Sequence, residues 1–580
     1  MPKLALGGTL ALVAVGLLCL RLLRHRQPLP SSGTHVWRSP AVLAVIPLLL
    51  AAVAGIWTSD HAALVVRTLP WLVAGCVFLV ATTHLLDEND RKRVLYLLIW
   101  PAAALALVGL LQAMELWQPM EFQRRIGARL ATTSLAGGAF DLSAYLLLPL
   151  ILAQERLWSR RGLPMHSARR WIWASAVLLF AGALVATQTL GSILAAIAGS
   201  LAFWISLAWR GELPRRRLGL VLGCGAILVL VAVLAVAPLR SRVHQKVRQI
   251  QRGDVNVFLT GRLDGWRAAL WMAQQRPLTG VGIGGFRAEF GDARLALQDQ
   301  GVEFHGGHRQ PYFVNAHNEV LEILAELGWP GLFAIVWLLW IVGQRSRARC
   351  RQRDDDAEDA DSWVAFLVAT TVAMVVVSLT NFPWRLALIA FPWLLVVASL
   401  LDSAHRPDES ESEARGSRRN GFAWPVALAV ASLVGAYWLF DHGKARVGCQ
   451  RLVQTAESLA LESARRGAMP HRARELGLDM LRRAENLDPA EVAVPITRGG
   501  LFMVAGRTEA AERSYRAALD MENRPEIWIN LARMRLSAGD RDAAIEAART
   551  AQRLDSRVAR KLPEFPELAT PKKKTVPAPK

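Results

Sequence analysis

Cysteine is scarce in this sequence, and the few cysteines form no recognised pair motif. Five occur among 580 residues, and no two of them are spaced as CxxC. Three of the five, Cys19, Cys76 and Cys224, lie in apolar blocks. This pattern argues against a disulfide framework and against a structural zinc site. The long loops also lack clusters of Asp, His or Cys with metal-ligand spacing, so we expect neither a metal ion nor another cofactor.

Charged residues are almost absent from several long stretches of the chain. The stretches 41–57, 62–85 and 94–111 together contain a single charged side chain, that of Arg67. Each is close to the roughly 20 apolar residues that cross a bilayer as a helix. Hydrophobic residues make up 53% of the chain, and the mean hydropathy is +0.25, which is too apolar for a soluble protein of this size. The sequence therefore predicts an integral membrane protein.

Positive charge is abundant, with a formal net charge of +20. Such an excess can indicate nucleic-acid binding. Most of the arginines, however, lie in short loops between the apolar blocks, where basic residues orient a protein in its membrane. We therefore expect no nucleic-acid partner.

The apolar blocks predict an all-α fold, a polytopic bundle of about a dozen transmembrane helices over residues 1–441. We interpret 4–23 as a span and not as a signal peptide, because basic residues close it and no small-residue cleavage site is evident. The stretch 171–208 is too long for one span, so we divide it at the polar turn 187–192. The predicted spans are 4–23, 41–57, 62–85, 94–113, 139–154, 171–187, 190–208, 218–238, 319–343, 363–380, 384–401 and 422–440.

The loops between these spans alternate in charge. The basic loops are 21–38, 86–93, 155–170, 209–217, 344–362 and 402–421, and the short, nearly uncharged ones are 58–61, 188–190 and 381–383. Basic loops stay in the cytoplasm. Counting spans then places the uncharged loops, the longer loops 114–138 and 239–318, and everything after residue 441 on the external side.

Residues 450–565 change character and repeat with a period of 33. Gly506 matches Gly539, Ala518 matches Ala551, and 487–489 suggests an earlier copy. Small residues at such positions let paired helices pack closely, and the pattern resembles a tetratricopeptide repeat. A generic alanine-rich helical bundle is the alternative. We expect a separate repeat domain that can bind a protein partner, preceded by a polar linker around 441–448 and followed by a disordered basic tail, 566–580.

The loop 239–318 carries the most distinctive motifs. It contains Gly-Arg-Leu-Asp-Gly-Trp at 261–266 and a glycine-rich run at 280–285, and it ends in Ala-His-Asn at 316–318. The glycine run follows no strand of an α/β unit, so we reject a dinucleotide site. Beyond His317, the residues Glu319, Glu322 and Glu326 share one helical face. Carboxylates there are costly unless they face a polar cavity, although a helix N-terminus also favours acidic residues.

The order of these motifs resembles the O-antigen ligase and O-antigen polymerase superfamily over residues 120–400. The shared pattern is Gly-Arg-Leu, then Trp, then Pro-Leu-x-Gly-Val-Gly-x-Gly-x-Phe, then His-Asn-Glu-x-Leu-Glu-x-x-x-Glu-Leu-Gly. The resemblance implies a metal-independent glycosyltransferase of the bacterial inner membrane that acts at the periplasmic face. It implies transfer of a glycan from an undecaprenyl-diphosphate carrier to lipid A–core, to a growing glycan or to a protein hydroxyl.

The resemblance and the chemistry of the reaction together predict the residues of the site. A departing diphosphate gains negative charge, which guanidinium groups stabilise well. Arg262 matches the family's loop arginine. His317 matches the family histidine, and we expect it to accept the proton of the acceptor hydroxyl. The expected substrate-binding residues are Asn318, Glu319, Trp266, Arg67, Arg125 and Arg129, the last two, with Arg124, by their place in the loop 114–138 alone.

Several functions stay open at this point. The chain has Thr189-Leu190-Gly191 where the family usually has Ser-Arg-Gly, which removes an arginine and weakens the ligase interpretation. An O-antigen or exopolysaccharide polymerase and a protein O-oligosaccharyltransferase are therefore alternatives to a ligase. A transporter of inorganic carbon would need paired repeats, and no second copy of the His317 region is present. A mere anchor for the repeat domain would leave the motif-rich loop unexplained.

Overall fold

The computed structural model describes residues 2–25, 39–117, 125–126, 129–130, 132–159, 168–235, 237–305, 312–351, 358–402, 423–467 and 469–568. Within these ranges the fold is helical, as predicted. The exception is a minimal antiparallel ladder between β1 (Arg125–Ile126) and β2 (Arg129–Leu130).

The helical part begins with apolar helices and ends with amphipathic ones. In chain order it comprises α1 (Pro2–His25), α2 (Pro40–Thr58), α3 (Ala62–Leu85), α4 (Glu88–Leu97), α5 (Ile99–Ala113), α6 (Ala139–Tyr145), α7 (Leu147–Trp158), α8 (Ala168–Ala186), α9 (Leu190–Trp209), α10 (Arg215–Ala235), α11 (Ala237–Gln251), α12 (Val255–Phe258), α13 (Arg262–Gln275), α14 (Phe286–Asp299), α15 (Glu319–Arg351), α16 (Glu358–Ser378), η2 (Pro383–Arg385), α17 (Ala387–Leu401), α18 (Ala423–Arg465), α19 (His471–Leu487), α20 (Ala493–Val504), α21 (Thr508–Met521), α22 (Pro525–Ser537) and α23 (Arg541–Leu554).

The apolar helices are those of a multi-pass membrane protein. Among the described residues, five helical segments are long and apolar enough to cross a bilayer: Pro40–Thr58, Ala62–Leu85, Glu88–Ala113, Leu190–Trp209 and Glu319–Cys350. Shorter apolar helices accompany them, among them Gly7–Leu17, Arg170–Ala186, Ser362–Ser378 and Ala387–Leu401. The predicted number of a dozen spans is therefore not confirmed. One physical reason is that several predicted spans are interrupted, as where 139–154 divides into α6 and α7 at Leu146.

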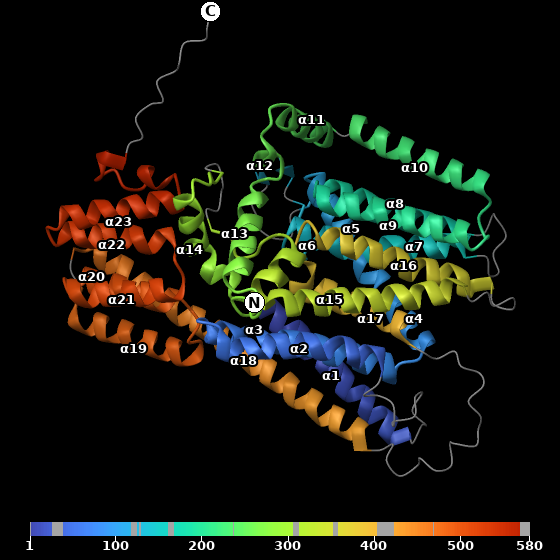
Figure 1. Ribbon diagram of the computed structural model, residues 1–580, viewed down its shortest axis with the longest axis horizontal. Helices are drawn as coiled ribbons and strands as arrows, with labels where there is room; N and C mark the ends of the chain where they lie inside the picture. Colours follow the sequence, from blue (N-terminus) through green and yellow to red (C-terminus); the bar gives the residue numbers. More distant parts are fainter. Residues whose placement is uncertain are drawn as a thin grey trace, which may run out of the picture.

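The loops that we expected on one side of the membrane meet at one end of the bundle. Ser59 Oγ donates to the carbonyl of Val281 over 2.6 Å, which joins the loop 58–61 to the long loop 239–318. The loop 381–383 joins the same group, because Arg262 Nη2 donates to Asn381 Oδ1 over 3.3 Å. This end lies on the left in Figure 1, beside the C-terminal helices.

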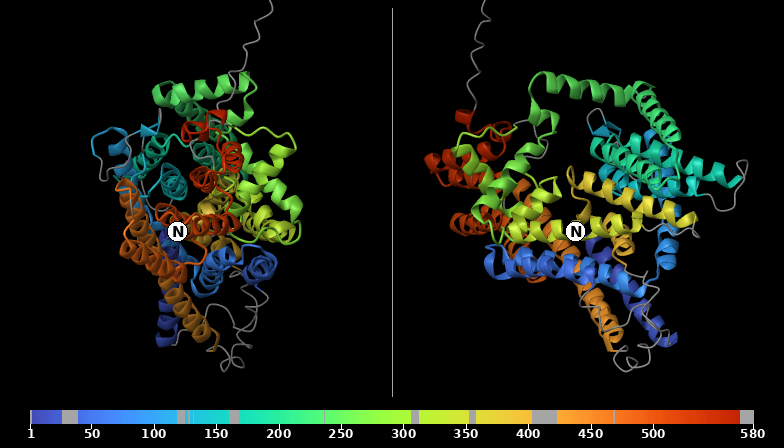
Figure 2. Two further views of the ribbon diagram at one scale, coloured as in Figure 1. Left: turned by 90° about the vertical axis from the view of Figure 1, so that its left-hand side faces the viewer. Right: turned by 45° about the vertical axis from the view of Figure 1, so that its right-hand side comes forward.

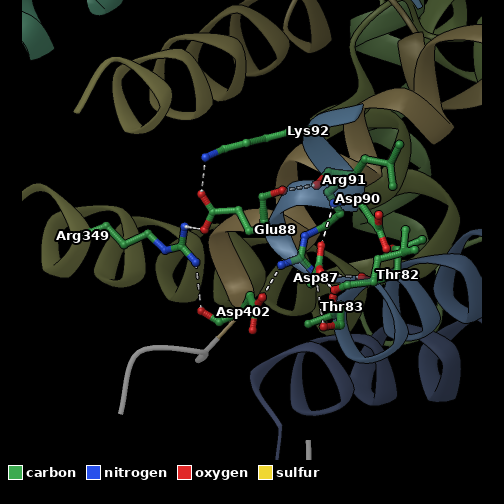
Figure 3. A network of polar contacts seen from close by, with 12 residues as sticks. Thr82, Thr83, Asp87, Glu88, Asp90, Arg91, Lys92, Arg349 and Asp402 are labelled. Carbon is green, nitrogen blue, oxygen red and sulfur yellow. Dashed lines mark hydrogen bonds and ion pairs between the residues drawn. The ribbon is translucent and has the colours of Figure 1, made fainter. Parts of the chain in front are cut away.

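The opposite end of the bundle is held by buried charge (Figure 3). Arg91 is fully buried, and it pairs with Asp402 while donating to the carbonyls of Thr82, over 2.9 Å, and Leu86, over 2.6 Å. Arg349 at the end of α15 donates to the Asp402 carbonyl over 3.2 Å. Residues of the loop 86–93, the end of α15 and Asp402 therefore meet, so part of the arginine excess is structural.

The helix α18 joins the membrane bundle to the C-terminal helices without a break. It has 43 residues, and it packs along α1 before reaching α19 and α20 (Figures 1 and 2). The polar linker predicted around 441–448 is thus wrong. Its polar residues occupy the middle of one helix, where side chains such as that of Arg446 face the folded protein instead of solvent.

The helices after α18 form cores of their own. The helices α20 and α21 pack together, as do α22 and α23, around buried small and aromatic residues such as Ala518, Ala551 and Tyr515. Gly499 lies so close to Tyr515 that an added Cβ would stand 2.5 Å from that ring. Most of the predicted tail 566–580 lies outside the described residues, and its first three residues form a 3-10 turn with Leu568 buried.

Candidate functional site

A cavity of about 860 Å³ opens where the bundle meets the long loop and α18. Its wall divides into two parts of different chemistry. One part is apolar and comes from α1, α3, α17 and neighbouring segments, with Leu10, Trp71, Phe78, Leu98 and Phe391 among its residues. The other part carries cationic side chains, namely Arg67, Arg287, Arg385 and Arg446. A ligand that fits such a cavity has an apolar body and an anionic head.

Three of these arginines have a buried side-chain N–H group that makes no hydrogen bond with the described part of the chain. Among the described residues, the buried Nε–H groups of Arg67, Arg287 and Arg385 have no hydrogen-bond partner within the chain. Arg67 is only 9% exposed. A buried guanidinium N–H without an acceptor is costly, and a phosphate oxygen is the kind of acceptor that it binds most strongly. The arginine end of the cavity is therefore suited to an anionic group.

The acidic helical face predicted from the sequence lies next to this end. Glu319, Glu322 and Glu326 are all buried on the first turns of α15. Arg385 Nη2 lies 3.0 Å from Glu322 Oε1 and 2.6 Å from Glu326 Oε2, and Glu319 Oε1 accepts from the Trp384 amide over 3.1 Å. The carboxylates thus face a cation within the protein, which accounts for their burial. They hold the turn η2, and with it Arg385, against α15.

The loop that bears His317 is fixed by the glycine run. The amides of Val281 and Gly282 donate to the carbonyls of Ala325 and Glu326, each over 2.9 Å. An added Cβ on Gly280 would stand 2.3 Å from the carbonyl carbon of Glu326. The glycines therefore serve a close approach of two backbones, at the point where Gly328, with φ 64°, kinks α15.

His317 is held in an uncommon backbone conformation, with φ 55°. Its ring lies 5.9 Å from that of Phe313 and 5.0 Å from that of Phe382, measured between centroids. Burial and the nearby charge of Arg262 lower its pKa to about 4, although a hydrogen bond with Asn381 acts in the opposite direction. Among the described residues, its Nδ1 has no hydrogen-bond partner. His317 is therefore neutral near pH 7, with a nitrogen able to accept a proton.

Arg262 and His317 come together through Asn381. Arg262 begins α13 after Gly261, whose φ of 80° suits glycine, and it reaches Asn381 from there. Neither Arg262 nor His317 lines the cavity directly. Phe382 both lines the cavity and contacts the His317 ring, so His317 lies next to a side chain of the cavity wall.

The other predicted residues have different places. Asn318 Oδ1 accepts from the amides of Val320 and Leu321, each over 3.1 Å, and so caps α15. Trp266 follows Arg262 by one turn of α13, and its buried indole N–H has no partner among the described residues. Arg67 lines the cavity, whereas Arg125 and Arg129 are described only as members of the ladder β1–β2. Arg124 lies outside the described residues.

Sequence reasoning missed the arginines that complete the cavity. We counted 381–383 as an uncharged loop and assigned Arg385 to a span, so its charge was not considered. Arg287 and Arg446 carried no motif at all. Arg385 had one signal that could have revealed it, since an arginine at the edge of an apolar block needs a partner, and three glutamates of α15 were available.

One comparison with known proteins bears on this geometry. The sequence model of a family described as O-antigen ligase matches residues 175–336, which include Arg262, His317 and the glycine run. No curated protein matches the chain significantly. The family match and the apolar helices support a ligase-like membrane glycosyltransferase that uses a lipid-linked glycan and an acceptor in a membrane.

Proposed function

We propose that this protein transfers a glycan from an undecaprenyl-diphosphate carrier to an acceptor hydroxyl, in the manner of an O-antigen ligase, at the periplasmic face of the bacterial inner membrane. The observation that carries the proposal is the two-part wall of the cavity. A polyprenyl chain suits the apolar part, and a diphosphate suits the arginines at the other end.

In this mechanism the acceptor oxygen attacks the anomeric carbon of the donor glycan. The bond between that carbon and the diphosphate oxygen breaks, and the carrier leaves as the free lipid diphosphate. His317, neutral because of its low pKa, takes the hydroxyl proton. Arg262 stabilises the negative charge that develops on the leaving diphosphate, and the cavity arginines bind the diphosphate of the donor. The chemistry assigned to these residues requires no metal ion.

Reconstituted protein with a lipid-linked glycan donor tests the proposal. We expect His317→Ala to lower turnover by about 10²–10⁴, and Arg262→Ala to lower it by about 10²–10³. Arg262→Lys should rescue poorly, because an ammonium cannot reproduce the guanidinium fork. Added chelator should leave the rate unchanged.

The matched controls are His471→Ala and Arg498→Ala, whose side chains form ion pairs within the C-terminal helices. Both should leave transfer intact. Lipid A–core, a second lipid-linked glycan and a serine-containing peptide, offered separately as acceptors, distinguish a ligase from a polymerase and from a protein O-oligosaccharyltransferase. Near-normal turnover of His317→Ala at normal protein levels would refute the general-base role.

A further inference from the structure

Three buried acidic residues follow alternate helices of the C-terminal region. Asp488, Glu522 and Asp555 follow directly on α19, α21 and α23, at the helix C-caps. They lie 34 and 33 residues apart, close to the period of 33 in the sequence repeat. All three are buried, and a negative charge at a helix C-terminus is unfavourable. Each therefore needs a cation nearby.

The membrane bundle and its long loop supply some of these cations. The C-terminal region supplies others, since Arg524 pairs with Glu522 and Arg557 with Asp555. Arg67 Nη2 lies 3.4 Å from Asp488 Oδ2 and 3.4 Å from Glu491 Oε2, and its Nη1 donates to the Ala490 carbonyl over 3.2 Å. Arg287 Nη2 lies 2.5 Å from Glu522 Oε1. Asp555 attracts Arg294 and thereby partly offsets the burial that lowers the pKa of that guanidinium.

The contact between the two regions is close and specific. Asn523 Nδ2 donates to Asp292 Oδ1 over 2.7 Å. Directly beside it, an added Cβ on Gly291 would stand 2.0 Å from the Asn523 carbonyl oxygen. On the other side, Arg446 Nη2 donates to the Arg67 carbonyl over 2.6 Å. In Figure 1, α14 lies between α13 and the C-terminal helices. The arrangement is therefore that of a fixed interface.

Two of the arginines engaged in this way also line the cavity. Arg67 and Arg287 each use their terminal nitrogens toward the C-terminal helices, while the Nε–H of each is buried without a partner among the described residues. A carboxylate on one edge of a guanidinium fixes the plane of the group and leaves its other edge for a second acceptor. The carboxylates of Asp488, Glu491 and Glu522 can thus orient the free edges of Arg67 and Arg287 toward the cavity.

We propose that Asp488, Glu491 and Glu522 are positioning residues for Arg67 and Arg287, so that the C-terminal repeat region forms part of the anion-binding site instead of serving only to recruit a partner. The inference rests on the proposed function, because it takes the anion to be the diphosphate of the donor. The region then contributes to donor affinity without touching the donor.

Binding of farnesyl diphosphate to the full-length protein in nanodiscs provides the test, with farnesol as the uncharged comparison. We expect Glu522→Gln, and the pair Asp488→Asn with Glu491→Gln, to weaken binding by about tenfold, the usual scale of coupling within one ion-pair network. With the complete donor, KM should rise by the same factor while kcat stays unchanged. In an Arg287→Gln background, Glu522→Gln should cause no further loss.

The control is Asp299→Asn at the same interface. Asp299 pairs with Arg553 over 2.5 Å, but neither residue lines the cavity, so binding should be unchanged. Wild-type protein that fails to bind farnesyl diphosphate would overturn the proposed donor site, and this inference with it. Wild-type binding together with equal or tighter binding by folded Glu522→Gln protein, checked by thermal melting, would overturn the positioning role alone.

Discussion

His317 combines features that a proton acceptor needs, although only some of them could be predicted from the sequence. The motif predicted its importance and its place before a helix. The motif could not indicate that Asn381, Phe382 and Arg262 surround the ring, because these contacts join three segments that are distant in the chain. The side-chain oxygen of Asn318, which is also expected to bind substrate, caps α15.

The low pKa of His317 predicts how transfer depends on pH. Because burial and Arg262 lower this pKa to about 4, the imidazole is already neutral at pH 6. The rate should therefore stay level between about pH 6 and 8 and fall only as the pH approaches the pKa of His317. Arg262→Gln removes a positive charge, so protonation becomes easier and the acid limb of the residual activity should move to higher pH. If the rate of the wild-type protein instead fell near pH 6.5, the ordinary pKa of histidine, the lowered pKa of His317 would be contradicted.

At the scale of elements, the glycine run illustrates what a motif can and cannot say. The pattern alone resembles a nucleotide-binding loop. In the structure, the positive-φ glycines of this run let the loop pack on the backbone of α15 near Gly328. The helix α15 is the one that carries the acidic face. The predicted turn 187–192 does contain a break, because α8 ends at Ala186, but the break is shorter than predicted, because α9 already begins at Leu190. The interrupted spans and the continuous α18 were not predicted, since hydropathy does not show where a helix breaks or continues.

Replacing one of these glycines by alanine should therefore lower the stability of the protein by more than the strain of a positive φ alone. Gly280→Ala has to move the carbonyl of Glu326, and we expect it to lower stability by about 3 kcal/mol. Gly253→Ala is the matched control, because Gly253 also has a positive φ, of 72°, but an added Cβ there would meet nothing within 4 Å. We expect that control to cost about 1 kcal/mol. Thermal melting in detergent compares the two variants, and equal melting temperatures would contradict the packing role of Gly280.

At the scale of the whole molecule, the membrane bundle and the C-terminal region behave as one body. The change of composition near residue 450 falls within α18, and the next helix, α19, begins at His471. It could not reveal that α18 continues without a break or that the acidic turns dock beside the cavity, because periodic sequence describes the packing within repeats and not their external contacts. The buried pairs of Arg67 and Arg287 supply the physical link between the two regions.

This docking makes the side of the membrane testable at one position. Because Asp488 pairs with Arg67 and Glu522 with Arg287, the C-terminal region must lie on the same side as the loop that bears His317. Described residues at the ends of three basic loops, Arg91, Arg349 and Asp402, meet at the opposite end, and basic loops stay in the cytoplasm. Alkaline phosphatase fused after residue 565 should therefore be active, since this enzyme needs the oxidising periplasm for its disulfides. The same enzyme inserted in the loop 402–421 should be silent. A silent fusion after residue 565, with an active cytoplasmic reporter there, would place the cavity on the cytoplasmic side and exclude transfer in the periplasm.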